Sequence, residues 1–436
     1  MNDISIIILA AGNGTRMKSS KSKVLHELCG EPMITHILKK SYEITSDVRV
    51  VLSYQFEEVK SVVLAEFENT KICKQDIVNF PGTAGALRAA INDLNSKKTL
   101  IICGDMPLVQ VNELKALCKN SSDVTLSAFK AIDPNGYGRV ITKDKKVVKI
   151  VEQKDANEDE IKVDLCNAGA YCFDTNLLKD LIPLIKNNNA SKEFYLTDAI
   201  ELAINRGFSV SFSLVSEANF MGINDKFALS LAEEIMQNSI KEKLMKNGVI
   251  MHLPKTIFID SRAKFEGECI IEPNVMIIGN SVIKNSVIKS GSVIEYSQVD
   301  SSDVGPMAHL RPNSKIQKTH IGNFVELKNA NLDTVKAGHL SYLGDCDISS
   351  GTNIGCGTIT CNYDGKKKHK TIIGKNVFIG SDTQLVAPLS IADDTLVAAG
   401  STVTKNSSKG DLIITRNAQI NKPMYFYKFF GKNDEK

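Results

Sequence analysis

The stretch from residue 373 to residue 403 reads IGKNVFIGSDTQLVAPLSIADDTLVAAGSTV and carries an apolar side chain at every sixth position. These positions are Ile373, Ile379, Leu385, Ile391, Val397 and Val403. Small or β-branched residues lie four places after several of them, at Val377, Thr383, Thr395 and Ser401. A strict period of six predicts a parallel β-helix, in which each apolar side chain points inward at the same place on successive faces.

The same period continues toward the N-terminus of this stretch. Two overlapping series keep it, namely Val282, Ile288 and Ile294, and Val287, Val293 and Val299. It breaks between Ile354 and Ile373, where Thr360–Lys370 (TCNYDGKKKHK) is polar and contains a glycine. We expect this segment to loop out from the wall of the β-helix, where solenoids often carry their function.

A continuous helical pattern precedes the six-residue repeats. Apolar residues recur at helical spacing at Phe227, Leu231, Ile235, Ile240 and Leu244, and Gly248 follows them. A helix of about 20 residues would be roughly 30 Å long and would serve as a rigid spacer. We therefore expect an N-terminal domain at residues 1–226, a helical linker at 227–247 and a hexapeptide-repeat domain at 248–436.

The N-terminal domain alternates short β-branched runs with helical stretches. The predicted strands are Ile4–Leu9, Arg49–Ser53, Thr99–Cys103, Val124–Phe129 and Gly169–Phe173, and the predicted helices are Met33–Glu43, Gly82–Asn92, Val111–Asn120 and Leu196–Asn205. This alternation is typical of a doubly wound α/β fold with a largely parallel sheet. Ligands of such sheets bind at the carboxyl ends of the strands.

Composition is that of a folded, soluble protein. Among 436 residues 43% are hydrophobic and 24% are charged, and the formal net charge is +3. This near balance argues against a general nucleic-acid or membrane-surface binder. No apolar run is long enough for a membrane span, and Met1–Ala11 reads as a buried strand rather than a signal peptide. The ten cysteines form no CxxC pair, which is consistent with reduced thiols in the cytoplasm.

A glycine-containing turn follows the first predicted strand in LAAGNGTRM, residues 9–17. Its glycines would let backbone N–H groups approach phosphates, with Arg16 and Lys23 as cations, although a plain tight turn remains an alternative. Asp105 in CGDMP ends another strand and is well placed to hold Mg²⁺. It lies too early to cap the helix near Val111. Asn224 could share the metal or be an ordinary turn residue.

Taken together, the motifs of this half resemble the sugar-nucleotide pyrophosphorylases. The motifs are LAAGNGTRM with Lys23, CGD at 103–105, YGR at 137–139, VEQKD at 151–155, CNAG at 166–169 and MGIND at 221–225. With the C-terminal half included, the whole chain resembles the bifunctional GlmU family. The resemblance implies coupling of UTP to N-acetylglucosamine 1-phosphate, which gives UDP-N-acetylglucosamine and pyrophosphate for cell-wall and lipopolysaccharide precursors.

The resemblance also implies roles for individual residues. The uridine nucleotide would contact Leu9, Ala10, Ala11, Gly12, Lys23, Gln75, Gly82 and Thr83. Mg²⁺ would be held by Asp105 and Asn224, and the sugar by Gly138, Glu152 and Asn167. Arg16 and Lys23 would stabilise the charge that develops on the phosphates.

Some positions depart from the usual family pattern. Ser22 stands where proline usually precedes the lysine, and Cys103 replaces an aromatic residue. Residues 81–86 read PGTAGA in place of the commoner LGTGHA, after a segment from Gln75 that is slightly longer than usual. These departures bear most on the uracil-binding role of Gln75.

The C-terminal repeats contain a dense polar cluster where a purely structural coil would be monotonous. Arg311 and Lys328 are about one coil apart, so they can stack on one face as an anion site. Acetylation of an amine needs a base, and histidine titrates in the right range. His339, flanked by glycine and near Tyr342, is the best candidate, whereas we interpret His320 as structural.

The resemblance to the GlmU acetyltransferase agrees with this interpretation. It implies transfer of acetyl from acetyl-CoA to glucosamine 1-phosphate, with His339 as proton acceptor. Arg311 and Lys328 would bind the phosphate of the substrate, and Tyr342 and Asn353 its sugar. Asn362 and Tyr363 would contact acetyl-CoA where it meets the sugar, and the other acetyl-CoA contacts would be Cys356, Ser381, Ala399 and Arg416. Cys356 stands where alanine is common, and direct transfer to the amine needs no thiol nucleophile.

Within that family the fold is a left-handed parallel β-helix and acetyl-CoA lies between neighbouring subunits, which implies a homotrimer. The aromatic, basic tail Met424–Phe430 could pack on a neighbouring coil or close over the acetyl-CoA site. Two other interpretations remain open. One is a single-activity nucleotidyltransferase whose solenoid only assembles the oligomer, and the other is a non-catalytic scaffold that retains sugar-nucleotide binding.

Overall fold

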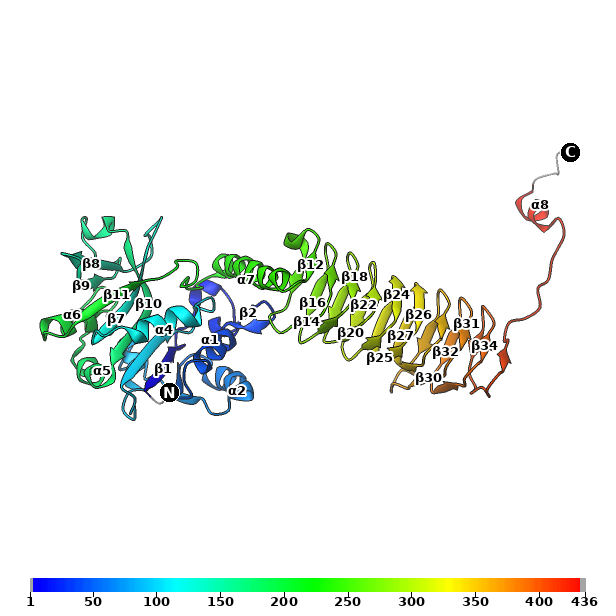
Figure 1. Ribbon diagram of the computed structural model, residues 1–436, viewed down its shortest axis with the longest axis horizontal. Helices are drawn as coiled ribbons and strands as arrows, with labels where there is room; N and C mark the ends of the chain where they lie inside the picture. The colour runs from blue at the N-terminus through cyan, green and yellow to red at the C-terminus, as the bar shows by residue number, and fades with distance from the viewer. Residues whose placement is uncertain (1–2, 432–436) are drawn as a thin grey trace. The chain divides into compact units, whose positions relative to one another are not determined.

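The chain folds into two compact units, Met1–Ser239 and Ile240–Lys436 (Figure 1). A computed structural model describes residues 3–431. The division falls inside helix α7, Lys226–Lys246, which coincides almost completely with the predicted linker helix.

The first unit contains a nine-stranded sheet with the order β11-β7-β10-β6-β1-β4-β5 and the hairpin β8-β9 joined to β10. The strands are β1 Ile4–Leu9, β4 Val48–Leu52, β5 Lys71–Lys74, β6 Lys98–Cys103, β7 Val124–Lys130, β8 Arg139–Lys143, β9 Lys146–Val151, β10 Leu165–Asp174 and β11 Val210–Leu214. A small separate hairpin pairs β2 Glu27–Leu28 with β3 Glu31–Pro32. The order places β1 and β6 side by side near the middle of the sheet.

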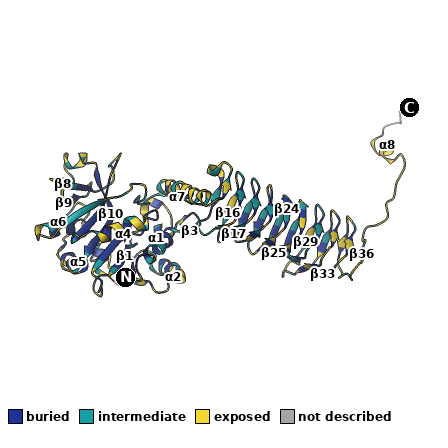
Figure 2. Ribbon diagram, viewed as in Figure 1, coloured by how far each residue is buried: buried dark blue, intermediate teal, exposed yellow. Residues whose placement is uncertain are grey.

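Helices pack on both faces of this sheet, as the alternating pattern predicted. They are α1 Met33–Tyr42, α2 Phe56–Glu66, α3 Thr83–Arg88, α4 Val111–Lys119, α5 Thr175–Leu181 and α6 Asp198–Asn205. In β1, Ile6 and Ile8 face the core formed with α1, α2 and α4, whereas Ile7 faces the core formed with α3, α5 and α6. Figure 2 shows the resulting buried centre.

Strand β10 interrupts the parallel arrangement, because it runs antiparallel to both β6 and β7. The sequence predicted only its second half, at Gly169–Phe173, and missed the β8-β9 hairpin that pairs with it. The register of β10 shifts between Asn167 and Tyr171, so this strand contains a bulge.

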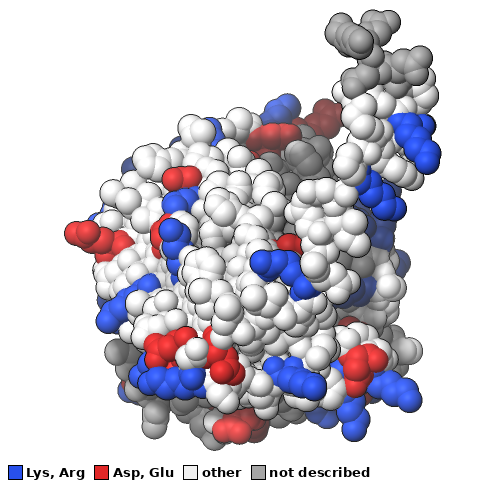
Figure 3. Space-filling model, turned by 90° about the vertical axis from the view of Figure 1, so that its right-hand side faces the viewer, with Lys and Arg blue, Asp and Glu red and all other residues white. Residues whose placement is uncertain are grey.

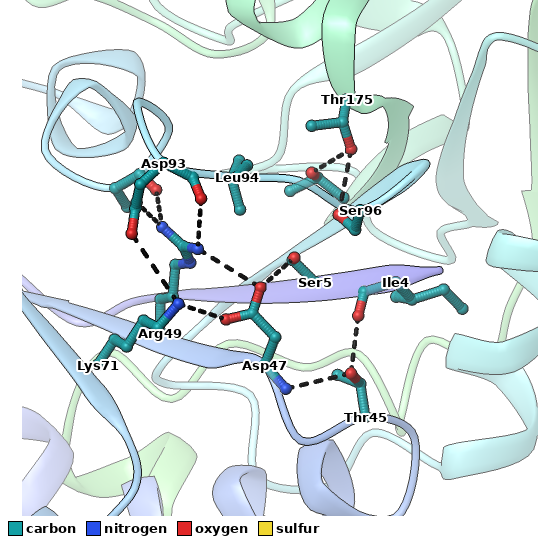
Figure 4. Close-up of polar contacts among 12 residues, drawn as sticks. Ile4, Ser5, Thr45, Asp47, Arg49, Lys71, Asp93, Leu94, Ser96 and Thr175 are labelled. Carbon is teal, nitrogen blue, oxygen red and sulfur yellow. Dashed lines mark hydrogen bonds and ion pairs between the residues drawn. The ribbon is translucent and has the colours of Figure 1, made fainter. Parts of the chain in front are cut away.

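The amino ends of the central strands are held by a buried cationic side chain, Arg49 of β4 (Figure 4). Its guanidinium donates to the carboxylate of Asp93 and, at 3.0 Å, to the carbonyl of Ala90. Asp47 accepts from Arg49 at 3.4 Å and pairs with Lys71 at 3.2 Å. A buried guanidinium is tolerated only when paired in this way, so the network joins β1, β4 and β5 to the segment after α3.

The second unit is a parallel β-helix with three faces of stacked short strands. Face 1 contains β12 Ile250–Met251, β15 Ile270–Ile271, β18 Val287–Ile288, β21 Asp303–Val304, β24 His320–Asn323, β26 Lys336–His339, β28 Asn353–Ile354, β31 Phe378–Ile379, β34 Leu396–Val397 and β36 Leu412–Ile413. Face 2 contains β13 Phe258–Ile259, β16 Met276–Ile278, β19 Val293–Glu295, β22 His309–Arg311, β29 Ile359–Cys361, β32 Gln384–Val386 and β35 Thr402–Val403. Face 3 contains β14 Lys264–Glu266, β17 Val282–Lys284, β20 Gln298–Asp300, β23 Lys315–Gln317, β30 Thr371–Ile373 and β33 Leu389–Ile391. β25 Glu326–Asp333 and β27 Tyr342–Ile348 run from face 2 to face 3.

The inward-facing residues confirm the strict six-residue period at one end of this domain only. All six apolar residues from Ile373 to Val403 are buried. In the earlier coils the buried positions are five or six residues apart, as at Ile288, Ile294, Val299, Val304 and Leu310. Each predicted series therefore mixes inward residues with half-buried ones such as Val287 and Val293, because the true spacing is not constant.

The interruption of the repeats is a loop, as predicted, but it is shorter than expected. Thr360 and Cys361 belong to strand β29, and the polar segment leaves the wall after them. It returns at β30, with one bridge between Tyr363 and Lys368. The register of the coil is unchanged across the loop, since Ile354 pairs directly with Ile379.

The apolar residues of helix α7 differ in their burial. Phe227 and Leu231 are exposed, whereas Ala232 is buried with the core of the first unit. Ile240 and Leu244 pack against the core of the β-helix. The predicted helix is confirmed, and its apolar residues are buried to different extents along its length.

A short helix, α8 Tyr425–Phe430, follows the β-helix and presents exposed aromatic side chains. Figure 3 shows positive and negative side chains interspersed on one face of the molecule, as expected from the small net charge. None of the helices among residues 3–431 combines the length and hydropathy needed to cross a bilayer.

Candidate functional sites

A pocket of about 460 Å³ opens at the carboxyl ends of β1 and β6, where the α/β pattern predicted a ligand. The residues around it are Leu9, Ala10, Ala11, Gly12, Asn13, Gly14, Thr15, Lys23, Val24, Gln75, Ile77, Gly82, Thr83, Ala86, Cys103, Asp105 and Glu193. Every residue predicted to contact the uridine nucleotide is among them. Segments far apart in the sequence thus converge on one cavity.

Two glycines in or beside this pocket, Gly14 and Gly104, have no room for a side chain. A Cβ at Gly104 would lie 2.8 Å from that of Ala10, so β1 and β6 can approach closely only with glycine there. Gly14 has a φ of 59°, and a Cβ on it would meet the side chain of Lys23. The turn after β1 therefore requires glycine and sets the position of the lysine.

Oxygen donors and cations meet at the edge of the pocket. Lys23 Nζ lies 2.5 Å from Asp105 Oδ2 and 2.9 Å from Asn224 Oδ1. Arg16 also donates to Asn224 Oδ1, at 2.8 Å. Because one carboxylate and one amide oxygen converge on a single ammonium, their geometry suits a small cation.

This donor set fits Mg²⁺ better than a metal held entirely by protein. Among residues 3–431 there is no group of three or more His, Cys, Asp or Glu side chains arranged to hold a metal. Mg²⁺ commonly takes one or two protein oxygens and completes its shell with water and substrate phosphates. Asp105 and Asn224 could serve in this way.

The longer segment between Gln75 and Gly82 folds back against α3. The Gln75 side-chain amide donates to the carbonyls of Phe80 and Gly82, at 2.9 and 3.1 Å. The Phe80 carbonyl occupies the space where a Cβ of Gly85 would lie. The longer segment between Gln75 and Gly82 and the glycine at position 85 thus depend on each other, because the segment fills the space that a larger residue at position 85 would need.

Ser22 and Cys103, the other departures, have clear physical explanations. Ser22 has a φ of −53° and a ψ of 139°, which are backbone angles that proline would also adopt. The Cys103 thiol contacts the Gly169 carbonyl at 3.7 Å, and burial raises its pKa to about 12. Cys103 is therefore a neutral wall residue of the pocket.

The three residues predicted to hold the sugar lie close together: Gly138 directly precedes β8, Glu152 directly follows β9, and Asn167 is in β10. The backbone N–H of Asn167 donates to the Gly138 carbonyl at 2.9 Å, and Gly138 lies against the Glu152 carboxylate. Burial raises the pKa of Glu152, while a hydrogen bond from Thr197 at 3.3 Å opposes this shift. Cys103, which contacts Gly169 near Asn167, also lines the pocket at the ends of β1 and β6, so the two groups adjoin.

In the β-helix, the predicted anion-binding residues stack on face 2. Arg311 of β22 and Lys328 of β25 are direct neighbours in the strand register. Arg311 donates to Glu326 at 2.9 Å, and Glu326 is paired in register with Tyr342. The prediction that the two cations share one face is confirmed.

His339 lies at the corner between face 1 and face 2 and is exposed. Its register places it two residues after Ala337, and Cys356, Ser381 and Ala399 take the same place in the next three coils. Arg416 joins this series, because its guanidinium donates to the Ala399 carbonyl at 2.7 Å. We call the series His339, Cys356, Ser381 and Ala399 the corner column.

The polar loop after β29 lies beside face 2. The Asn362 amide donates to Asp345 at 2.5 Å, and a Cβ on Gly344 would meet both this amide and the Tyr342 hydroxyl. Tyr342 and Asn362 are therefore close together. Tyr363 is exposed and donates its hydroxyl to the Gly365 carbonyl within the loop.

Sequence reasoning missed Lys368, which this loop brings to the same face. Lys368 lies 3.9 Å from Asp345, and contact with its side chain lowers the pKa of Lys328. Three cationic side chains, Arg311, Lys328 and Lys368, thus gather around one surface. The signal available in the sequence was the basic run Lys366–Lys368 inside a predicted loop.

Asn353 is not brought to face 2 within one chain. It begins β28 on face 1, paired with Lys336 and Phe378. His320 is also on face 1, where its Nδ1 contacts Asp303 at 2.8 Å. One chain therefore gathers Arg311, Lys328, Tyr342 and Asn362, with His339 at the adjoining corner and Asn353 on the next face.

Residues 6–156 match the family model described as a MobA-like NTP transferase domain. This match covers β1, β6 and most of the residues of the pocket. It agrees with the phosphate-binding interpretation of the turn after β1.

Relatives over the full length come from several Campylobacter species. The chain is 79% identical to the bifunctional protein GlmU of Campylobacter fetus over 436 residues, which is 100% of both chains. It is 66% identical to that of Campylobacter hominis over 99% of both, and 58% identical to that of a Campylobacter jejuni strain over 98% of this chain and 99% of the relative. At this identity and coverage the chain belongs to the bifunctional GlmU family, the two-activity transferases that its sequence motifs predict.

Proposed function

We propose that this protein acetylates glucosamine 1-phosphate with acetyl-CoA and then couples the product to UTP. The final products are pyrophosphate and UDP-N-acetylglucosamine, and UDP-N-acetylglucosamine is a precursor for cell-wall and lipopolysaccharide synthesis. Residues 1–226 would carry the uridylyl transfer, residues 227–247 would form the linker, and residues 248–436 would carry the acetyl transfer.

The corner column is the observation that carries the acetyltransferase assignment. It aligns the candidate base with three of the residues assigned to acetyl-CoA, one coil apart along a single edge. A solenoid that only assembled an oligomer would not need an exposed histidine at the end of such a series beside three cations. The stacking supports an extended co-substrate lying along the edge.

In the acetyl transfer, Arg311, Lys328 and Lys368 would bind the sugar phosphate by charge-assisted contacts. His339 would accept the proton that the amine loses as its nitrogen attacks the thioester carbonyl. The carbon–sulfur bond then breaks, and coenzyme A leaves as the thiolate. Tyr342 and Asn362 would orient the sugar between these groups.

In the uridylyl transfer, an oxygen of the sugar phosphate attacks the α-phosphorus of UTP, and pyrophosphate leaves. Lys23 and Arg16 stabilise the charge that spreads over the phosphate oxygens. Mg²⁺, held by Asp105 and Asn224, would neutralise phosphate charge in the same place. Gly138, Glu152 and Asn167 would position the sugar so that its phosphate faces the α-phosphorus.

The Asn353 assignment requires a second copy of the chain, because Asn353 faces away from Tyr342 within one chain. A homotrimer would supply it, with face 1 of one copy beside face 2 of the next. Exposed apolar residues at the corner between these faces, Met307, Phe324 and Leu340, support such a contact. Sedimentation equilibrium of the full chain should give three times the monomer mass.

We place the protein in the cytoplasm. This placement is supported by its cysteines, since none of those in residues 3–431 forms a disulfide. It is also the compartment in which UTP and acetyl-CoA are available as substrates.

One assay tests the two activities together. The intact protein is given glucosamine 1-phosphate, acetyl-CoA, UTP and Mg²⁺, and the product mass is measured. We expect UDP-N-acetylglucosamine from the full mixture and no sugar nucleotide when acetyl-CoA is omitted. Supplying N-acetylglucosamine 1-phosphate should restore the product without acetyl-CoA. If the protein did not consume acetyl-CoA, the result would contradict the acetyltransferase activity and support the alternative of a single-activity nucleotidyltransferase.

A further inference from the structure

The bulge in β10 brings together two side chains that a regular strand would hold apart. Asn167 and Tyr171 are four residues apart, which corresponds to roughly 13 Å along an extended strand. The register shift between them, with Gly169 at a φ of 81°, shortens this path. As a result, the Asn167 side-chain amide donates to the Tyr171 hydroxyl at 2.6 Å.

Both ends of the Asn167 amide are held in place. Its Oδ1 accepts from the backbone N–H of Gly169 at 3.2 Å, while its Nδ2 donates to Tyr171. Its own backbone N–H donates to the Gly138 carbonyl. One N–H of the amide is left to donate to a ligand, and its direction is fixed by Tyr171.

Tyr171 is suited to hold another side chain rather than to react. Its side chain is almost completely buried, and burial together with the nearby Glu152 carboxylate raises the pKa of its phenol. The hydroxyl therefore stays neutral and accepts a hydrogen bond. It lies near two of the residues assigned to the sugar, Asn167 and Glu152.

We infer that Tyr171 is a positioning residue for sugar binding, which holds the Asn167 amide in the orientation that receives N-acetylglucosamine 1-phosphate. This inference rests on the proposed function, in which Asn167 contacts the sugar. The departure at position 103 is consistent with it. Cys103 replaces the usual aromatic residue at the end of β6, and the aromatic ring near this part of the site comes instead from Tyr171 on the adjacent strand.

The test is the Tyr171→Phe variant of the full chain, which keeps the ring and removes only the hydroxyl. We expect KM for N-acetylglucosamine 1-phosphate to rise on the order of five- to tenfold, the usual effect of one hydrogen bond. KM for UTP and kcat should change less than twofold. Tyr42→Phe is the matched control, since the Tyr42 hydroxyl bonds to Thr70 at 2.8 Å, outside the pocket.

A double-mutant cycle separates this inference from the proposed function. Asn167→Ala should also raise KM for the sugar phosphate, and adding Tyr171→Phe to it should cause no further rise. Independent, multiplying effects would overturn the positioning role, as would an unchanged KM in Tyr171→Phe. If Asn167→Ala itself leaves KM for the sugar phosphate unchanged, the sugar contact fails and the inference fails with it.

Thermal unfolding of the same variants detects a merely structural effect. Tyr171→Phe and Tyr42→Phe each lose one hydroxyl contact, so similar small decreases in Tm are expected. If both variants showed the same decrease in Tm and the same kinetics, Tyr171 would contribute only to stability.

Discussion

Lys23 and Asp105, which both line the pocket at the ends of β1 and β6, form an ion pair at 2.5 Å. The lysine follows the glycine turn after β1, and the aspartate follows β6, so the two neighbouring strands deliver opposite charges to one point. Asn224 joins the pair through Lys23. A nucleotide with its metal would have to bind between these groups. We therefore expect uridylyl transfer to be sensitive to the substitution of either residue.

Asp105→Ala should lower pyrophosphate release by at least about 100-fold, because it removes the carboxylate of the proposed cation site. Acetyl-CoA consumption by the same protein should stay within twofold of the unchanged chain. Asp180→Ala, at an exposed position of α5, is the control for loss of a carboxylate. Loss of both activities in Asp105→Ala would contradict two independent sites.

His339→Ala should reduce acetyl transfer at neutral pH by about 100-fold or more, which is the usual contribution of general base catalysis. Uridylyl transfer from N-acetylglucosamine 1-phosphate should be unaffected. His320→Ala removes another histidine of the β-helix, one that contacts Asp303, and should retain acetylation. Near-normal acetylation by His339→Ala would mean that another group takes the proton.

Lys368→Ala should raise KM for glucosamine 1-phosphate about tenfold with little change in kcat, since it removes one charge-assisted phosphate contact. Lys366→Ala changes a lysine of the same loop and serves as the control. Steady-state acetylation at varied sugar concentration makes the comparison. Equal effects of the two substitutions would show a general influence of loop charge rather than a specific contact.

Arg49→Ala should destabilise the first unit by about 2 kcal/mol, because it removes the hydrogen bonds and ion pairs of a buried guanidinium while its partners Asp93 and Asp47 remain partly exposed to water. The hydrogen bond from Arg49 lowers the pKa of Asp93, and Asp47 also has a lowered pKa, since bonds from Ser5 and its cationic neighbours outweigh burial. A carboxyl group whose pKa is lower in the folded state than in the unfolded state stabilises the folded protein at pH values above its unfolded pKa of about 3.9. This stabilisation is lost as the pH falls toward the lower pKa of the folded state.

The difference in free energy of unfolding between the unchanged chain and Arg49→Ala should therefore be largest near pH 7 and should decrease below about pH 4. Denaturant unfolding at several pH values measures it. A difference that stays constant down to low pH would indicate that packing, rather than charge pairing, is lost.

Asp198→Asn should stabilise the first unit above pH 6. Burial, with help from Glu201 and Glu152, raises the pKa of Asp198 to about 6. Since folding favours the protonated form, the ionised carboxylate destabilises at higher pH, and this penalty disappears below about pH 4. Partial exposure limits the gain to about 1 kcal/mol.

Asp180→Asn, at an exposed position of α5 and not among the neighbours that raise the pKa of Asp198, is the control for Asp198→Asn. Tm measured at pH 4 and pH 7 gives the comparison. An increase in Tm that is equal at both pH values would show that the effect does not come from ionisation.

The sequence predicted the fold well where one physical rule dominates. The buried series from Ile373 to Val403 follows because every coil there has the same length. Earlier coils are shorter by one residue at some corners, as between Ile294 and Val299 and between Val299 and Val304. A fixed period cannot represent this variation, so half of the predicted inward residues between 282 and 299 were wrong.

The candidate sites were predicted best where the residues follow a strand directly, as Asp105 does. Lys368 was missed because its position depends on the path of a loop rather than on a period. The Asn167–Tyr171 contact was missed because it depends on a bulge. The coupling of Phe80 with Gly85 could not be foreseen either, since it arises from a backbone carbonyl that folds back over a helix.

The uniform stacking of the β-helix has a consequence for how this protein can change over evolution. Each coil touches only its two neighbours, so a whole coil can be added or removed at either end without altering the rest. Between His339 and Ala399 the situation is different, because one coil more or less would shift the distance from base to co-substrate by about 4.8 Å. The number of coils is thus constrained between His339 and Ala399, whereas it can vary at the ends of the β-helix.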